Sequence, residues 1–130
     1  MNVRQRKILS LRNTDVNSAV RRLSGDEELY AACLRAFLED RTIITLRESV
    51  RSGAWDDAFT AAHALKGVAG NMGFVPLMHA VGQLVVLIRG GRIAEIKEAM
   101  GKVDSCYRDI TDGIEQFLAL TEEDKKGEVV

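Results

Sequence analysis

Apolar residues recur every three or four positions along most of this chain, which is the spacing of one face of an α-helix. The period is cleanest from Ile93 to Phe117, where it continues through Ile96, Met100, Val103, Tyr107, Ile110 and Ile114. No stretch shows the sustained alternation of apolar and polar residues that is typical of strands. The pattern predicts an all-α protein.

Capping residues and glycines divide the first half of the pattern into two helices. Thr14 or Asp15 can cap a short helix that runs to about Leu23. A long helix is expected from near Asp26 to Gly53, because a capping-box spacing and a glycine precede it and its apolar rows continue without interruption.

The second half predicts three more helices. The first opens at Trp55 and ends at Gly73, which is placed for a left-handed helix end. Pro76 stands near the start of the next, where helices tolerate proline best, and the last carries the apolar row described above. Four long amphipathic helices with short connections favour an antiparallel up-down-up-down four-helix bundle, with the short N-terminal helix in addition.

The two ends of the chain lack this pattern. Residues 1–13 contain basic but no acidic residues and no sustained period, so they are expected to form a flexible basic arm. Residues 121–130 are charged and have no core face, so a disordered tail is expected. The folded domain is therefore predicted over residues 14–120.

Composition narrows the classes of function. Lysine and arginine number 18 and aspartate and glutamate 19, and a net charge of −1 gives no field to attract nucleic acid or an anionic membrane. The chain shows neither a signal-peptide pattern nor an apolar run long enough to span a bilayer, and its two cysteines lie within helical patterns. A reduced, cytoplasmic protein is expected.

The chemically distinctive stretch is AHALKGVAGNMGF, residues 62–74. It predicts a helix, yet Gly67 and Gly70 lie in its interior, where each costs on the order of 1 kcal/mol relative to alanine. His63 precedes Lys66 by three residues and Gly67 by four, so the three project from one patch. The patch combines an exposed imidazole, a cation for an anionic group and room for another protein. A surface histidine beside helix-packing glycines is the alternative.

The stretch and its place in the predicted bundle resemble the histidine-containing phosphotransfer (HPt) domains of two-component relays, including the N-terminal phosphotransfer domain of chemotaxis kinases. The most specific part is HALKG, residues 63–67, with Gly73 further on. Weaker matches are GDEELY at residues 25–30, RAFLED at residues 35–40 and the turn with Trp55. The resemblance covers residues 14–119.

The resemblance implies a role for each residue of the patch. His63 would accept the phosphoryl group, Lys66 would help to hold it, and Gly67 would let the active site of a partner approach. Phe37 and Phe59 would contribute to docking of the partner, although the helical period also allows Phe37 to be a core residue. Gly70 and Gln83 are further docking candidates.

The resemblance also implies the partners, a response-regulator receiver domain and a sensor or hybrid histidine kinase. The chain has no glycine-rich nucleotide loop and no acidic Mg²⁺ cluster near His63, so it is expected to be a phosphocarrier without an ATP site and not an enzyme. It would need no cofactor of its own, and Mg²⁺ is expected in the receiver domain. A monomer is favoured because four helices can cover one another, although the last helix could also serve a dimer.

Val85 departs from the family pattern. Many members carry glutamine or glutamate at this position to hydrogen-bond the histidine ring, and Gln83 is the nearest polar candidate here. This favours an alternative function, a helical adaptor that docks a receiver or kinase without carrying phosphate.

A metal-binding bundle has less support, because His79 is the only other histidine and no Glu-x-x-His spacing occurs. A dimerisation domain of a histidine kinase also carries a helical histidine, but the next residue there is typically acidic, whereas here it is Ala64.

Overall fold

The computed structural model describes residues 1–128, and the side chains of residues 1–120. The described residues form seven helices: α1 (Val3–Ser10), α2 (Val16–Arg22), α3 (Glu27–Glu39), α4 (Thr42–Ser52), α5 (Trp55–Met72), α6 (Val75–Arg89) and α7 (Ile93–Glu128). In this part of the chain β-structure is limited to one isolated antiparallel bridge between Thr14 and Phe74. The predicted all-α class is confirmed.

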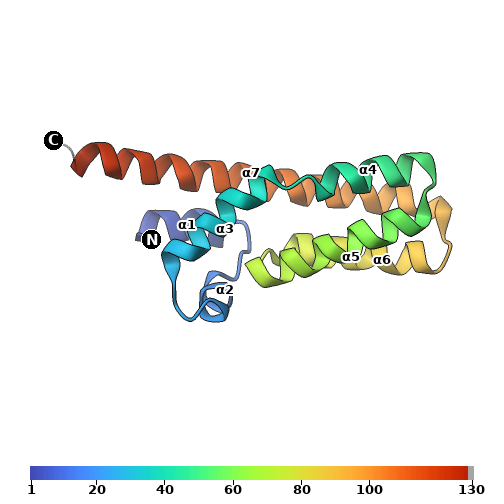
Figure 1. Ribbon diagram of the computed structural model, residues 1–130, viewed down its shortest axis with the longest axis horizontal. Coiled ribbons are helices and arrows are strands. Elements are labelled where there is room, and N and C mark those ends of the chain that lie inside the picture. The colour runs from blue at the N-terminus through green and yellow to red at the C-terminus, as the bar shows by residue number, and fades with distance from the viewer. Residues whose placement is uncertain (129–130) are drawn as a thin grey trace.

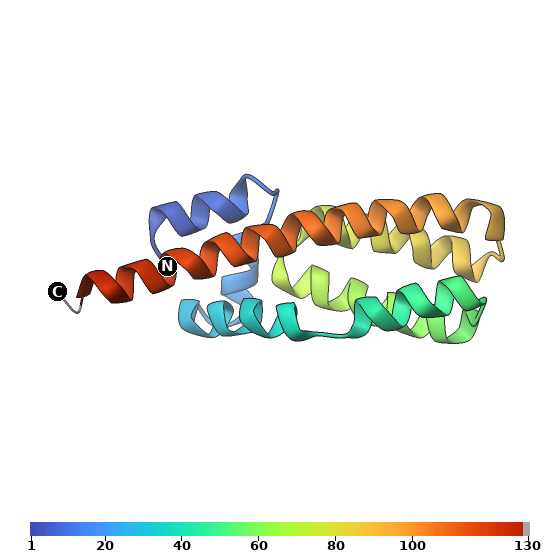
Figure 2. The same ribbon diagram turned by 90° about the horizontal axis from the view of Figure 1, so that it is seen from above.

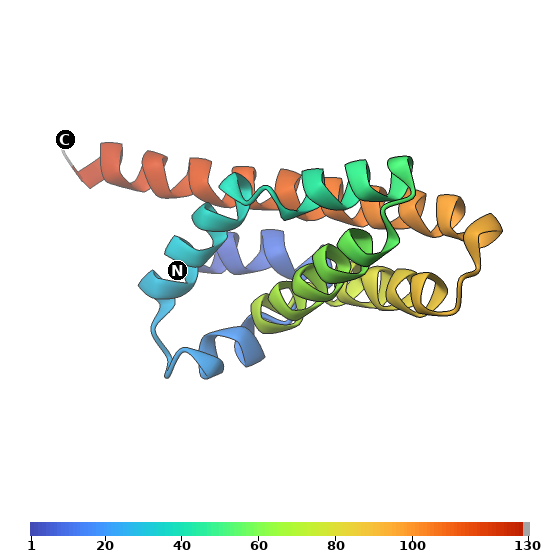
Figure 3. The same cartoon turned by 45° about the vertical axis from the view of Figure 1, so that its right-hand side comes forward.

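Helices α4, α5, α6 and α7 form a bundle in which successive helices run in opposite directions (Figure 1). α5 packs against α4 and α6, and α6 packs against α7. α7 extends past the other three helices, and α1 and α3 pack on this extension (Figure 2). α2 lies beside the end of α5 (Figure 3). None of the described helices is both long and apolar enough to cross a membrane.

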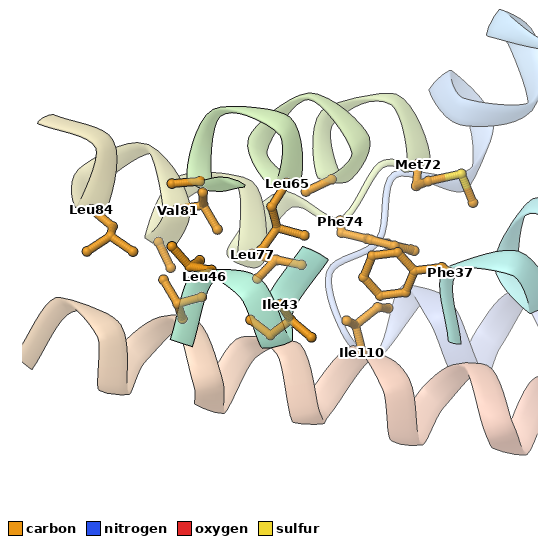
Figure 4. Packing of buried hydrophobic residues seen from close by; sticks show 14 of the residues in the cluster. Phe37, Ile43, Leu46, Leu65, Met72, Phe74, Leu77, Val81, Leu84 and Ile110 are labelled. Carbon is orange, nitrogen blue, oxygen red and sulfur yellow. The ribbon is translucent and has the colours of Figure 1, made fainter. Parts of the chain in front are cut away.

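The core contains the side chains that the helical period places inward. On α5 the buried row is Ala58, Ala62, Leu65, Ala69 and Met72. Figure 4 shows Leu65 of α5, Leu77 and Val81 of α6, Ile43 of α4 and Ile110 of α7 in the space between the helices, and all five are buried. Because one face of α5 is fixed in this core, its opposite face is turned to solvent.

The single long helix expected from Asp26 to Gly53 is wrong, because the chain breaks between α3 and α4. The backbone of Asp40 is extended, with φ −68° and ψ 131°. Its carboxylate accepts a hydrogen bond from the backbone N–H of Thr42, 2.7 Å away, which satisfies an amide in the first turn of α4. Next to the break, Phe37 turns inward and packs on Phe74 with ring centroids 5.0 Å apart.

The flexible arm expected over residues 1–13 is also wrong, because α1 forms there. Asn2 and Gln5 make a capping box: each side chain accepts a hydrogen bond from the other residue's backbone N–H, at 2.8 and 2.9 Å. Leu9 is fully buried, and the Arg6 guanidinium binds the Glu27 carboxylate at 2.9 Å. One buried leucine and a local cap therefore order a segment too short to show a clear apolar period.

The disordered tail expected from residue 121 is helical as far as Glu128, since α7 continues to that residue. Residues 129–130 of the predicted tail lie outside the described part of the chain.

Candidate functional site

The distinctive stretch lies on α5, which begins and ends as its sequence predicts. Asp56 and Asp57 occupy the first turn, where the helix dipole favours negative charge. Gly73 ends the helix with φ 79°, in the left-handed region. A Cβ at Gly73 would stand 2.4 Å from the backbone oxygen of Asp15, so both the backbone angle and the available space require glycine.

The N-terminal helices hold the carboxyl end of α5. The side chains of Arg22 and Tyr30 donate hydrogen bonds of 2.9–3.0 Å to the three carbonyls of residues 70–72. The backbone N–H of Asp15 donates to the Gly73 carbonyl at 2.8 Å. These donors satisfy carbonyls that a helix end leaves without partners. Burial raises the pKa of the Tyr30 hydroxyl above its ordinary value of 10.0, so this donor stays protonated.

His63, Lys66 and Gly67 are exposed together on the solvent face of α5, as their spacing predicts. Within residues 1–120 no hydrogen bond or ion pair engages the His63 imidazole. Its ring instead lies parallel to that of Phe59, one helical turn earlier, with centroids 6.0 Å apart and 5° between the planes. The guanidinium carbon of Arg89 lies 5.1 Å from the centroid of the same phenyl ring.

Three contacts fix the register between α5 and α6. The contacting pairs are Gly70 with Met78, Lys66 with Gly82, and Phe59 with Arg89. The residue numbers in each pair have the same sum, as expected for neighbouring antiparallel helices. The same register places Val85 of α6 opposite His63.

The stem of Lys66 lies across Gly82. A Cβ at Gly82 would be 3.6 Å from Cε of Lys66 and 3.9 Å from its Nζ. At these distances a Cβ would only touch the lysine, whereas a larger side chain would occupy the path of the lysine over α6. Gly82 was not among the site residues predicted from sequence, although a glycine inside a helix, costing about 1 kcal/mol, is a signal that could have identified it.

The two interior glycines of α5 differ in their surroundings. A Cβ at Gly67 would meet nothing within 4 Å, so this position is open to a partner. A Cβ at Gly70 would stand 3.3 Å from the sulfur of Met78, and Gly70 is half-buried. Gly67 thus opens the surface beside His63, whereas Gly70 allows α6 to pack closely.

The arrangement can accept an anionic group that another molecule delivers. An exposed imidazole stands one turn from an ammonium group, and the backbone beside both of them, at Gly67, is open. No group of three or more His, Cys, Asp or Glu side chains in the described residues could hold a metal ion.

Comparison with protein families gives a match to the Hpt domain over residues 27–122, most of the chain. The chain belongs to the Hpt domain family. Hpt domains are phosphocarrier modules of two-component phosphorelays, and the matched segment contains every residue of the patch on α5. Comparisons with curated proteins and with solved structures gave no match.

In this Hpt domain neither Val85 nor Gln83 provides a polar partner for the His63 ring. Val85 is opposite the histidine but is apolar. Gln83 lies in a groove between α6 and α7, beside His79 and Lys102. The structure therefore brings Phe59 to the histidine, keeps Gly70 on the same helix face under Met78, and separates Gln83 from both.

Proposed function

We propose that the protein is a histidine phosphotransfer protein that accepts a phosphoryl group on His63 and passes it to an aspartate of a response-regulator receiver domain. The observation that carries the proposal is the joint exposure of His63, Lys66 and Gly67 on one face of α5, in a chain of the Hpt family. The donor is a receiver aspartate or a histidine kinase.

The chemistry is a reversible exchange of one bond to phosphorus for another. The lone pair of a ring nitrogen of His63 attacks the phosphorus of an aspartyl phosphate, and an N–P bond forms as the P–O bond to the aspartate breaks. The carboxylate leaves with the electron pair of that bond. Onward transfer runs the same step in reverse on a second aspartate.

Lys66 supplies the charge that this step needs from the phosphocarrier. Its ammonium group, one turn from His63, offsets negative charge on the phosphoryl oxygens while the reacting groups are held in line. Further positive charge comes from Mg²⁺, which we place in the receiver domain. The open backbone at Gly67 lets that domain bring its aspartate to the histidine.

The test is transfer of labelled phosphate from phosphorylated receiver domains of the source organism. Wild-type protein is expected to gain label that is lost in acid and stable in alkali, as phosphohistidine is, and His63→Gln to gain none. His79→Gln is the matched control, since His79 is the other of two histidines and should leave labelling unchanged. Label retained by His63→Gln would overturn the assignment.

A helical adaptor that docks a receiver without carrying phosphate is the second candidate. The observation that favours it is the apolar Val85 opposite His63, where no polar group orients the ring. Stable binding of a phosphorylated receiver with no label transferred to wild-type protein would establish the adaptor instead.

A further inference from the structure

We propose that Phe59 and Arg89 hold the His63 ring in its reactive orientation, in place of a polar partner on α6. The inference rests on the proposed function of His63 as phosphoacceptor. It makes Phe59 a positioning residue, whereas the family resemblance implies a docking contact there.

The His63 ring needs such a device because little else restrains it. The side chain is exposed, no group in residues 1–120 hydrogen-bonds either ring nitrogen, and Val85 opposite can only offer van der Waals contact. An exposed side chain without partners exchanges among several rotamers. In-line attack requires one of them, so an unrestrained ring would present its nitrogen correctly for only part of the time.

Phe59 restrains the ring by stacking. Residues four apart on a helix face the same way, and here the two rings are parallel within 5° at a centroid distance of 6.0 Å. This is the offset parallel arrangement that aromatic pairs favour. The stack fixes the plane of the imidazole and leaves both ring nitrogens available to an incoming phosphoryl group.

Arg89 holds the phenyl ring in turn. Phe59 is only half-buried, so the bundle core does not fix it completely. The Arg89 guanidinium carbon lies 5.1 Å from the phenyl centroid, within the range of a cation–π interaction. No carboxylate among residues 1–120 forms an ion pair with Arg89. The contact ties the stack on α5 to α6, which a partner on α5 alone could not do.

The stack can be observed directly by NMR. The ring C–H signals of His63 carry a ring-current shift from Phe59, and Phe59→Leu is expected to remove it. Phe59→Tyr keeps an aromatic ring and is expected to preserve the shift. Arg89→Gln is expected to reduce the shift without abolishing it, because the phenyl ring then moves more freely. This measurement does not depend on phosphorylation.

The effect on reactivity is measured with phosphoramidate, a small donor that needs no protein docking. The lone pair of His63 attacks phosphorus as the P–N bond of the donor breaks. The donor nitrogen takes up a proton from water and leaves as ammonia. Phe59→Leu is expected to slow the labelling of His63 by about three- to tenfold, and Arg89→Gln by less. Phe59→Tyr should restore the rate to within about twofold of wild type. Arg35→Gln, an exposed arginine on α3, serves as the charge-matched control.

Three outcomes would overturn the inference. Normal phosphoramidate labelling of both Phe59→Leu and Arg89→Gln would remove the positioning role. So would unchanged His63 ring signals in Phe59→Leu. Slow transfer from a receiver combined with normal phosphoramidate labelling would make Phe59 a docking residue. Equal labelling of wild type and His63→Gln would instead refute the proposed function, which separates the two failures.

Discussion

The side chain of Lys66 crosses α6 at Gly82, where a Cβ would stand 3.6 Å from Cε of the lysine. A larger side chain there would occupy the path that the lysine takes. We expect Gly82→Leu to slow transfer from a receiver to His63, although residue 82 lies on α6 and not on the helix that carries His63. Gly101→Leu is the matched control, because Gly101 lies within α7 with open space around it.

Lys66→Ala shows how much the transfer rate depends on the lysine that Gly82→Leu would displace. A charge-assisted contact is worth about 1.5–3 kcal/mol, so its loss should slow transfer by roughly 10- to 100-fold. Because Lys66 is exposed, the free energy of unfolding should change by less than about 0.5 kcal/mol. A transfer rate equal to that of wild type would remove Lys66 from the mechanism and leave Gly82→Leu without an explanation.

Gly67→Gln should separate docking from chemistry. Nothing lies within 4 Å of a Cβ at this position, so the variant should fold and its helix should gain up to about 1 kcal/mol. The glutamine would project into the space that a receiver domain must enter. We expect slower transfer from the receiver but normal labelling by phosphoramidate. Equal slowing with both donors would mean that the substitution disturbs His63 itself.

Gly73→Ala should have the opposite effect on stability from Gly67→Ala. At Gly73 the backbone is left-handed and a Cβ would stand 2.4 Å from the Asp15 oxygen, so alanine should destabilise the fold by at least about 2 kcal/mol. At Gly67 alanine should stabilise it by up to about 1 kcal/mol. Urea unfolding of the two variants measures both. A mild effect at Gly73 would show that α2 can move away from α5.

Stability at alkaline pH should depend on Tyr30. Its pKa is raised in the folded protein, chiefly by burial, so the unfolded chain loses this proton at lower pH than the folded one. The contribution of the raised Tyr30 pKa to the free energy of unfolding is complete below the ordinary pKa of 10.0, and it is lost as pH rises above that value. Tyr30→Phe should therefore lose stability less steeply above that pH than wild type.

At neutral pH Tyr30→Phe should cost about 1–3 kcal/mol, because the Met72 carbonyl loses its buried donor. Urea unfolding across the alkaline range measures both effects. Tyr107 has a pKa raised in the same direction and is present in both proteins, so the difference between them isolates Tyr30. Parallel pH dependence in the two proteins would contradict the assignment.

The face of α5 was predictable because a long helix repeats its period many times. Ala58, Ala62 and Leu65 mark the buried side, and this alone turns His63 and Lys66 outward. The break at Asp40 was not predictable from periodicity, since the apolar rows continue across it and one side-chain hydrogen bond decides where the chain bends. The apolar period therefore predicts which face of a helix is buried, but it does not predict where a helix is interrupted.

Contacts between helices depend on their register, which no single helix encodes. The period of α6 places Arg89 on an exposed face, but only the packing of α6 on α5 brings it to Phe59. In the same way Gly82 became part of the site through the neighbouring lysine. The short helix α1 begins with a capping box between Asn2 and Gln5, and both residues are visible in the sequence. The segment is basic and too short to show a clear apolar period, so the helix was not predicted.

The hydrogen bonds at the end of α5 bear on where this domain can be cut and transplanted. A fragment trimmed to the family match at residue 27 would keep Tyr30 but lose Arg22 and Asp15, the donors to the carbonyls of Gly70, Asn71 and Gly73. The last turn of the histidine helix would then fray next to the surface that a receiver must recognise. A chimaera that moves this phosphocarrier into another relay protein should carry α1 and α2 with it.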